Sequence, residues 1–218
     1  MIKIQYTEEE SKHLFFTSDT HFNHKNIIKY TDRPFSSIEE HNQTLIDNWN
    51  SVVGPDDTVF HLGDFAFGTF NQWKMIREQL NGHIVLILGN HDFAQCDNIS
   101  RLNDLFDFVS QQMLIRVGKK RIILSHYPML CYSGYNSEKH PTWQLFGHVH
   151  LRKSGVYEGD MCRLEMCYRT QYEVGVDLNN FTPVSFESVR ERINIQQSTQ
   201  TNVLRWVRWF NRELKSLY

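Results

Sequence analysis

Histidine, aspartate and asparagine occur together in five short clusters along this chain of 218 residues. The clusters are D-T-H at 19–21, G-D at 63–64, G-N-H-D at 89–92, S-H at 125–126 and G-H-V-H at 147–150. They offer carboxylate, amide and imidazole groups but no thiolate, a donor set that suits manganese, iron, nickel or zinc. One ion takes about four to six ligands, so this many donors predicts two ions that share a bridging carboxylate.

Each cluster has a simpler interpretation when it is considered by itself. Asp-x-His after a strand is common, Gly-Asp often marks a turn, G-N-H-D can be an ordinary loop, and G-H-V-H can be two surface imidazoles beside a valine. The order of all five clusters, each at the end of a strand, is much harder to obtain by accident. The set as a whole therefore favours a metal site.

A short apolar segment of the kind that forms a buried strand precedes each cluster. The predicted strands are 13–17, 58–62, 84–88, 121–124 and 144–146. Helices are predicted at 36–53, with Ser36 and Ser37 as candidate N-caps, and at 71–80, before the helix-ending pair Asn81-Gly82. Alternating strands and helices predict a sheet covered by helices, in which ligands bind beyond the carboxyl ends of the strands. If the strands lie side by side, the clusters meet in one pocket.

Size and composition predict a single domain over residues 1–218. Hydrophobic residues make up 40% of the chain, enough for one substantial core. The formal net charge of -2 gives no overall reason to expect binding to nucleic acid or a membrane, and no apolar stretch is long enough for a transmembrane helix. Because the N-terminal segment lacks a signal peptide and the four cysteines form no C-x-x-C pair, we expect reduced thiols and a cytoplasmic location.

The ordered set D-x-H, G-D, G-N-H-D, H and G-H-x-H resembles the calcineurin-like metallophosphoesterase superfamily, and the resemblance spans residues 19–150. It implies an α/β fold, a four-layer α/β/β/α sandwich with two mixed sheets. It also implies a role for each residue of the clusters. The first metal would be bound by Asp19, His21, Asp64 and His150, and the second by Asp64, Asn90, His126 and His148.

His91 in G-N-H-D is similar to the family's active-site histidine, which contacts the phosphate or protonates the leaving group. Two ions about 3.5–4 Å apart would polarise the phosphoryl oxygens and lower the pKa of a bound water, which becomes hydroxide near neutral pH. We therefore expect a phosphoesterase with two divalent metal ions. Manganese is the first choice, and iron, nickel and zinc are the alternatives.

The expected substrate is a phosphate ester, with a phosphodiester in a nucleotide or nucleic-acid fragment as the leading hypothesis. A phosphomonoesterase or protein phosphatase is the enzymatic alternative. A metal-stabilised interaction module without catalysis is the non-enzymatic one. No membrane partner is expected, and homodimer formation is left open.

Three further residues are candidates for contact with the substrate. His24 closely follows the first strand, and Arg33 in T-D-R-P-F has a planar fork that matches two phosphate oxygens. Asp92 either orients His91 or caps a helix.

The motifs S-D-T-H-F-x-H-x-N-I-I, R-P-F and V-G-V-D also resemble a small bacterial and phage branch of the superfamily, and this narrower resemblance implies no substrate.

Two segments outside the clusters carry their own expectations. Residues 127–146 are rich in aromatic and turn residues and are expected to form a loop over the site. Their aromatic side chains either stack on a base or leaving group or pack the loop onto the domain. Residues 200–218 have the pattern of a basic amphipathic helix, docked on the domain or at a dimer interface.

Overall fold

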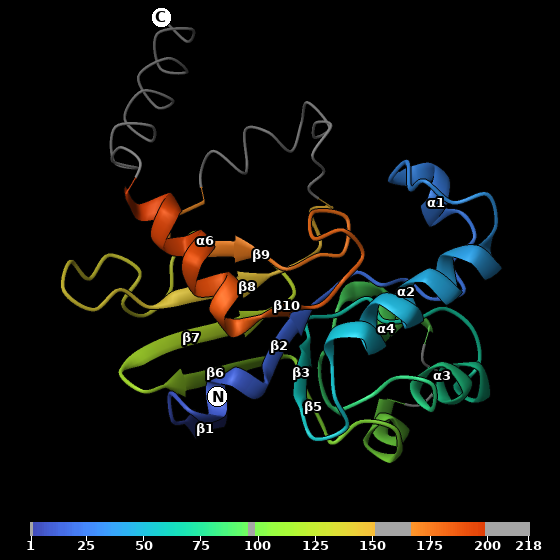
Figure 1. Ribbon diagram of the computed structural model, residues 1–218, viewed down its shortest axis with the longest axis horizontal. Coiled ribbons are helices and arrows are strands. Elements are labelled where there is room, and N and C mark those ends of the chain that lie inside the picture. The colour runs from blue at the N-terminus through green and yellow to red at the C-terminus, as the bar shows by residue number, and fades with distance from the viewer. Residues whose placement is uncertain (1, 96–98, 151–166, 199–218) are drawn as a thin grey trace, which may run out of the picture.

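Two five-stranded sheets packed face to face form the centre of the computed structural model, which describes residues 2–95, 99–150 and 167–198 (Figure 1). The first sheet has the order β10-β2-β3-β4-β5, and β10 is its one antiparallel strand. Its strands are β2 (Leu14–Thr17), β3 (Thr58–His61), β4 (His83–Ile87), β5 (Phe108–Ser110) and β10 (Val184–Ser185). These bounds confirm three of the predicted strands to within one residue at each end.

The second sheet has the order β1-β6-β7-β8-β9 and is also mixed, because only the β6–β7 pair is antiparallel. Its strands are β1 (Ile2–Tyr6), β6 (Gln112–Val117), β7 (Lys120–Ser125), β8 (Trp143–Phe146) and β9 (Gln171–Glu173). The two remaining predicted strands correspond to β7 and β8. The predicted α/β fold with two mixed sheets is thus confirmed, and the sequence patterns had not indicated that the five strands divide between two sheets.

Helices cover the first sheet on the side away from the second (Figure 1). These helices are α1 (Ile27–Tyr30), α2 (Ile38–Val52), α3 (Phe70–Arg77) and α4 (Asn90–Gln95). A further helix, α6 (Phe186–Ser198), packs against both sheets instead, and 3-10 turns occur at Glu10–His13 and Ile99–Asp104. Ser37 caps α2 by accepting a hydrogen bond from the backbone N–H of Glu40, and Thr69 forms a capping box with Gln72 at the start of α3. The two predicted helices are therefore confirmed, although α3 ends at Arg77, three residues before the predicted end.

Two apolar clusters hold these layers together. One lies between the sheets, where Phe16 and Phe60 of the first sheet share a core with Leu124 and Leu145 of the second. The other lies between the first sheet and α2 and α3, and it contains the fully buried rings of Trp49 and Trp73. Both faces of β2, β3 and β4 are buried, so their carboxyl ends are held in fixed positions.

Helix α6 contacts β2 and β10 of the first sheet and β9 of the second, so it closes the sandwich along one side. Phe186, Val189 and Ile193 enter the core between the sheets. The predicted helix at 200–218 lies outside the described residues, and the single domain over 1–218 stays a prediction. Within the described ranges, no helix combines the length and the apolar character needed to cross a membrane.

Candidate metal centre

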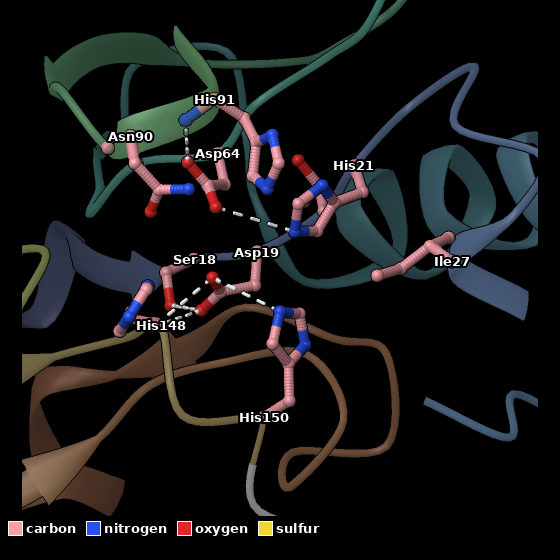
Figure 2. Close-up of polar contacts among 12 residues, drawn as sticks. Ser18, Asp19, His21, Ile27, Asp64, Asn90, His91, His148 and His150 are labelled. Carbon is pink, nitrogen blue, oxygen red and sulfur yellow. Dashed lines mark hydrogen bonds and ion pairs between the residues drawn. The ribbon is translucent and has the colours of Figure 1, made fainter. Parts of the chain in front are cut away.

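The polar clusters that follow the five predicted strands meet at one place, where Figure 2 shows the side chains of Asp19, Asp64 and His150 close to one another. Strands β2, β3 and β4 are parallel neighbours, and so are β7 and β8, so each set places its polar clusters along a single edge. The two edges are joined directly. Ser18 pairs with Gly175 in an isolated parallel bridge, and one ring nitrogen of His126 contacts the carbonyl oxygen of Leu62 at 2.7 Å.

One group of possible ligands consists of Asp19, His21 and His150, with one donor atom from each within 4.8 Å of the others. Two donors hold the carboxylate of Asp19 through three contacts: the Ser18 hydroxyl lies 2.6 Å from Oδ2, and the backbone N–H of His148 lies 3.1 and 3.0 Å from the two oxygens. The Nε2 atom of His150 lies 3.8 Å from Asp19 Oδ1. Residues that are 131 positions apart in sequence therefore form one side of the centre.

A second group consists of Asp64, His126 and His148, whose donor atoms also lie within 4.8 Å of one another. Oδ2 of Asp64 is 3.5 Å from His21 Nε2 and 3.5 Å from His126 Nε2, so this oxygen lies between the two groups. Asn90 joins the second group, because its Oδ1 is 3.1 Å from His126 Nε2. The structure thus brings all seven sequence-predicted ligands together, and the placement of Asp64 suits a bridging carboxylate.

The donor set fits bound cations. His21 is 1% exposed, and neither of its ring nitrogens has a hydrogen-bond partner among the described residues. A buried imidazole without partners costs folding free energy unless another group satisfies it. A metal ion coordinated by the ring of His21 would remove that cost.

The electrostatics of the two groups agree with this interpretation. Burial, together with the nearby His150 and Arg33, lowers the pKa of His21 well below its usual value, so its ring is neutral, as metal binding requires. Burial alone would also lower the pKa of His126, but the carboxylates of Asp64 and Asp19 raise it to about 9. The two carboxylates therefore attract positive charge strongly to this position.

Five of the seven possible ligands have a left-handed backbone, which is uncommon for residues other than glycine. Their φ angles are 57° for Asp19, 49° for His21, 58° for Asp64, 73° for His148 and 52° for His150. Asp and His tolerate this region better than most residues, yet each such position costs on the order of 1–3 kcal/mol. The two packed cores outweigh this cost, and the concentration of strained positions is typical of a functional site.

The glycines in two of the clusters are needed for close packing. A Cβ atom on Gly89 would overlap Oδ1 of Asp64, and one on Gly147 would overlap the side chains of Ser18 and Asp19. The motifs therefore contain glycine at these positions because the carboxylates that face the metal centre occupy the space of a side chain.

Arg33 does not serve as the predicted phosphate clamp. Its guanidinium is buried, and its donors go to both carboxylate oxygens of Asp177 (2.8 Å each), to the backbone oxygens of Thr20 (3.0 Å) and Asp19 (2.7 Å) and to His41 Nε2 (2.7 Å). The five N–H groups of an arginine are thus all used. Arg33 instead fixes the chain that carries Asp19.

Asp177 connects this arginine to a predicted ligand. Its Oδ2 lies 2.7 Å from Nδ1 of His150, which leaves Nε2 of that ring facing Asp19. Burial alone would raise the pKa of Asp177, but the charge of Arg33 and the contact with His150 hold it well below its usual range. No role was predicted for the aspartate of V-G-V-D, and the available signal in the sequence was an acidic residue directly after a strand-like V-G-V.

We expect Asp177→Asn to weaken metal binding by about 10–100-fold, because a partner that orients a histidine ligand has an effect of that size. The substitution keeps the shape of the side chain but removes the charge that faces Arg33 and His150. Titration of the metal-free protein with Mn²⁺ measures the affinity, and circular dichroism checks the fold. Asp56→Asn, on the exposed surface, is the matched control. Unchanged affinity in Asp177→Asn would show that Asp177 does not position His150.

His91 and His24 lie beside the metal groups without belonging to either. The His91 ring is 5.3 Å from the ring of His21, and its backbone N–H donates to Asp64 Oδ1 at 2.9 Å. The His24 ring stacks on Phe67 with 3.8 Å between ring centroids and is 6.0 Å from the His91 ring. Both histidines are half-buried, so they line the open side of the centre.

Asp92 is fully buried and accepts three backbone N–H groups at 2.8 Å, from Asp64, Phe65 and Gly89. Of the two sequence interpretations, the bond to Gly89 agrees with the helix cap, since Gly89 directly precedes α4. Burial and the charge of Asp64 raise the pKa of Asp92 to about 7. The structure therefore places Asp92 behind the site and not in contact with a substrate.

The aromatic residues of the segment 127–146 mostly pack onto the domain. Trp143 belongs to β8 and is buried in the core, and the Tyr132 hydroxyl lies 3.1 Å from Thr170 Oγ1. Tyr135 contacts the ring of Tyr168. Tyr127 differs, because it is 48% exposed and its ring lies 4.7 Å from that of His148. The predicted loop thus ends before β8. Among its described aromatic rings, that of Tyr127 contacts a candidate metal ligand, His148.

The fold and this centre agree with the family that the sequence matches. The chain belongs to the calcineurin-like phosphoesterase superfamily, whose domain model matches residues 13–163. An uncharacterized protein of Methanocaldococcus jannaschii is 36% identical over 81% of this chain and 88% of its own length. The gene 66 protein of Mycobacterium phage L5 is 32% identical over 75% of this chain and 86% of its own length.

A solved structure has a similar fold. The crystal structure of a protein of unknown function from Aquifex aeolicus is 28% identical, with a TM-score of 0.63 over 82% of this chain and 97% of that one. Membership of the superfamily supports a general role as a hydrolase of phosphate esters and agrees with the metal-ligand groups of the centre.

Proposed function

We propose that this protein is a phosphodiesterase that uses two divalent metal ions and acts on a nucleotide or nucleic-acid fragment. The observation that carries the proposal is the position of Asp64 Oδ2, at 3.5 Å from one histidine of each ligand group. A single carboxylate shared in this way supports two adjacent ions. Manganese remains the first choice, because the oxygen and nitrogen donors suit it.

The two ions, when bound, would supply positive charge to the phosphoryl oxygens and lower the pKa of water. The protein's own residues do the rest. Asp19, Asp64 and His21 form a buried floor, while His148 is exposed and His91 and His150 are half-buried. A phosphate ester therefore approaches from the side of His91, and the imidazole of His91 donates a proton to the departing oxygen. His24 lies next to His91 on that side and is placed to contact the substrate.

The preference for a diester rests on the role of Arg33. A monoester carries a second negative charge on its phosphate, and enzymes commonly hold it with arginine. Arg33 was the arginine best placed for that task, and its donors are already used within the protein. A second arginine close to the clusters, Arg152, follows G-H-V-H by two positions in the sequence and lies outside the described residues. The exposed ring of Tyr127 beside His148 is suited to stack on a base of the substrate.

Hydrolysis of bis-p-nitrophenyl phosphate and p-nitrophenyl phosphate by the manganese-loaded protein tests the proposal. We expect the diester to be preferred by about tenfold or more in kcat/KM, which corresponds to about 1.4 kcal/mol.

Tyr127→Ala should raise KM for a dinucleotide more than for the p-nitrophenyl diester, if the ring of Tyr127 stacks on a base.

The other outcomes identify the alternatives. A preference for the monoester would support a phosphomonoesterase or protein phosphatase. Tight metal binding without hydrolysis of either ester would support the non-catalytic interaction module. Homodimer formation stays a prediction, which the mass of the protein in solution would test.

A further inference from the structure

A second pocket lies on the outer face of the second sheet, away from the core. Its volume is about 320 Å³, and residues of β6, β7 and the segment 129–133 line it. Side chains alternate along β6, so Met113, Ile115 and Val117 enter the core while Leu114 faces outward. Leu114 lies directly opposite Ile123 of β7, and these two residues form an apolar floor beneath Met129.

One end of this pocket carries an unbalanced positive charge. Arg121 lines the pocket and lies directly opposite Arg116 in the β6–β7 pair. Like charges that face each other across an antiparallel pair are destabilising. Neither arginine forms an ion pair with an acidic side chain in the part of the chain that the structure describes. An anion bound here would relieve their repulsion.

A buried hydroxyl group lies at the same end. Thr142 lines the pocket and is 1% exposed, and its Oγ1 has no hydrogen-bond partner among the described residues. A Cβ atom on Gly134 would collide with both this oxygen and Nη2 of Arg121, so the two groups lie against the same glycine. A buried hydroxyl without a partner costs about 1–3 kcal/mol, which a ligand oxygen would recover.

We propose that this pocket binds a small organic anion. Its carboxylate or phosphate group would contact Arg121 and Thr142, and its apolar body would lie on Leu114, Ile123 and Met129. The volume is at the lower end for ligand pockets, so a molecule with a single ring is the expected size. This site is separate from the metal centre, and its occupation does not depend on the proposed function.

Cys131 provides a local readout, because it is exposed and lines the pocket. The full-length protein, with and without metal, is treated with iodoacetamide. Mass spectrometry of the peptide that contains Cys131 then gives the rate at which this thiol is alkylated. Benzoate and phenylphosphonate are the anionic probes, and benzyl alcohol is the neutral one. We expect saturable protection by at least one anion, with half-protection on the order of 1 mM, as for a ligand of about ten atoms. Whichever anion protects at the lower concentration identifies carboxylate or phosphate as the preferred group.

Variants assign the protection to the pocket. Arg121→Gln should raise the anion concentration needed for half-protection about tenfold, and Thr142→Val should raise it by a smaller factor. Arg101→Gln, on a distant 3-10 turn, removes the same charge and should leave protection unchanged. The proposal is overturned if neither anion protects Cys131 or if benzyl alcohol protects it as well as the anions do. It is also overturned if the anions protect Cys131 equally well in the wild type and in an Arg121→Gln variant that circular dichroism shows to be folded.

Discussion

Asp64→Ala is expected to abolish hydrolysis of phosphate esters and to lower the bound metal from about two ions to about one or fewer per chain. The carboxylate of Asp64 faces both ligand sets, at 3.5 Å from His21 Nε2 and from His126 Nε2. Without it, the positive charges of two neighbouring ions are no longer offset. We expect kcat/KM for the diester to fall by at least about 10³-fold, or about 4 kcal/mol.

Metal content by elemental analysis and hydrolysis of bis-p-nitrophenyl phosphate measure the two effects. Asp56→Ala removes an exposed aspartate and should change neither. Circular dichroism is needed as well, because Asp64 is buried and its Oδ1 accepts the backbone N–H of His91. A folded Asp64→Ala protein that retains two ions and normal turnover would rule out a bridging role.

His91→Ala is expected to lower kcat by about 10²–10⁴-fold without loss of metal, which is the usual range for removal of a general acid. The side chain of His91 belongs to neither ligand group, whereas its backbone N–H, which supports Asp64, remains in the variant. The loss should depend on the leaving group. A p-nitrophenolate leaves without protonation far more easily than an alkoxide, so the loss should be larger for a dinucleotide than for the p-nitrophenyl diester.

Turnover of these two substrates, together with metal content, distinguishes a proton donor from a ligand or from a residue that only binds phosphate. His140→Ala, which removes an exposed histidine of the segment 127–146, serves as the comparison. Equal losses for both substrates would mean that His91 binds the phosphate without donating a proton. Loss of metal would mean that it is a ligand.

Much of the centre could be predicted because its residues lie in local motifs. Asp19 and His21 directly follow β2, and Gly63-Asp64 closely follows β3, so the apolar pattern of each strand indicated where a polar cluster would begin. The role of Arg33 could not be predicted in this way. Its partner Asp177 is 144 positions away, and nothing near Arg33 in the sequence distinguishes a buried ion pair from a phosphate clamp.

The sequence by itself determined which residues form the strands and which donors follow them. Hydrophobic periodicity and short motifs are local, so they can be recognised without a fold. Only the tertiary structure decided how the polar clusters divide between the two sheets and that the guanidinium of Arg33 is buried against Asp177. Strand order and the pairing of distant charges result from packing of the whole chain, and no short stretch of sequence contains that information.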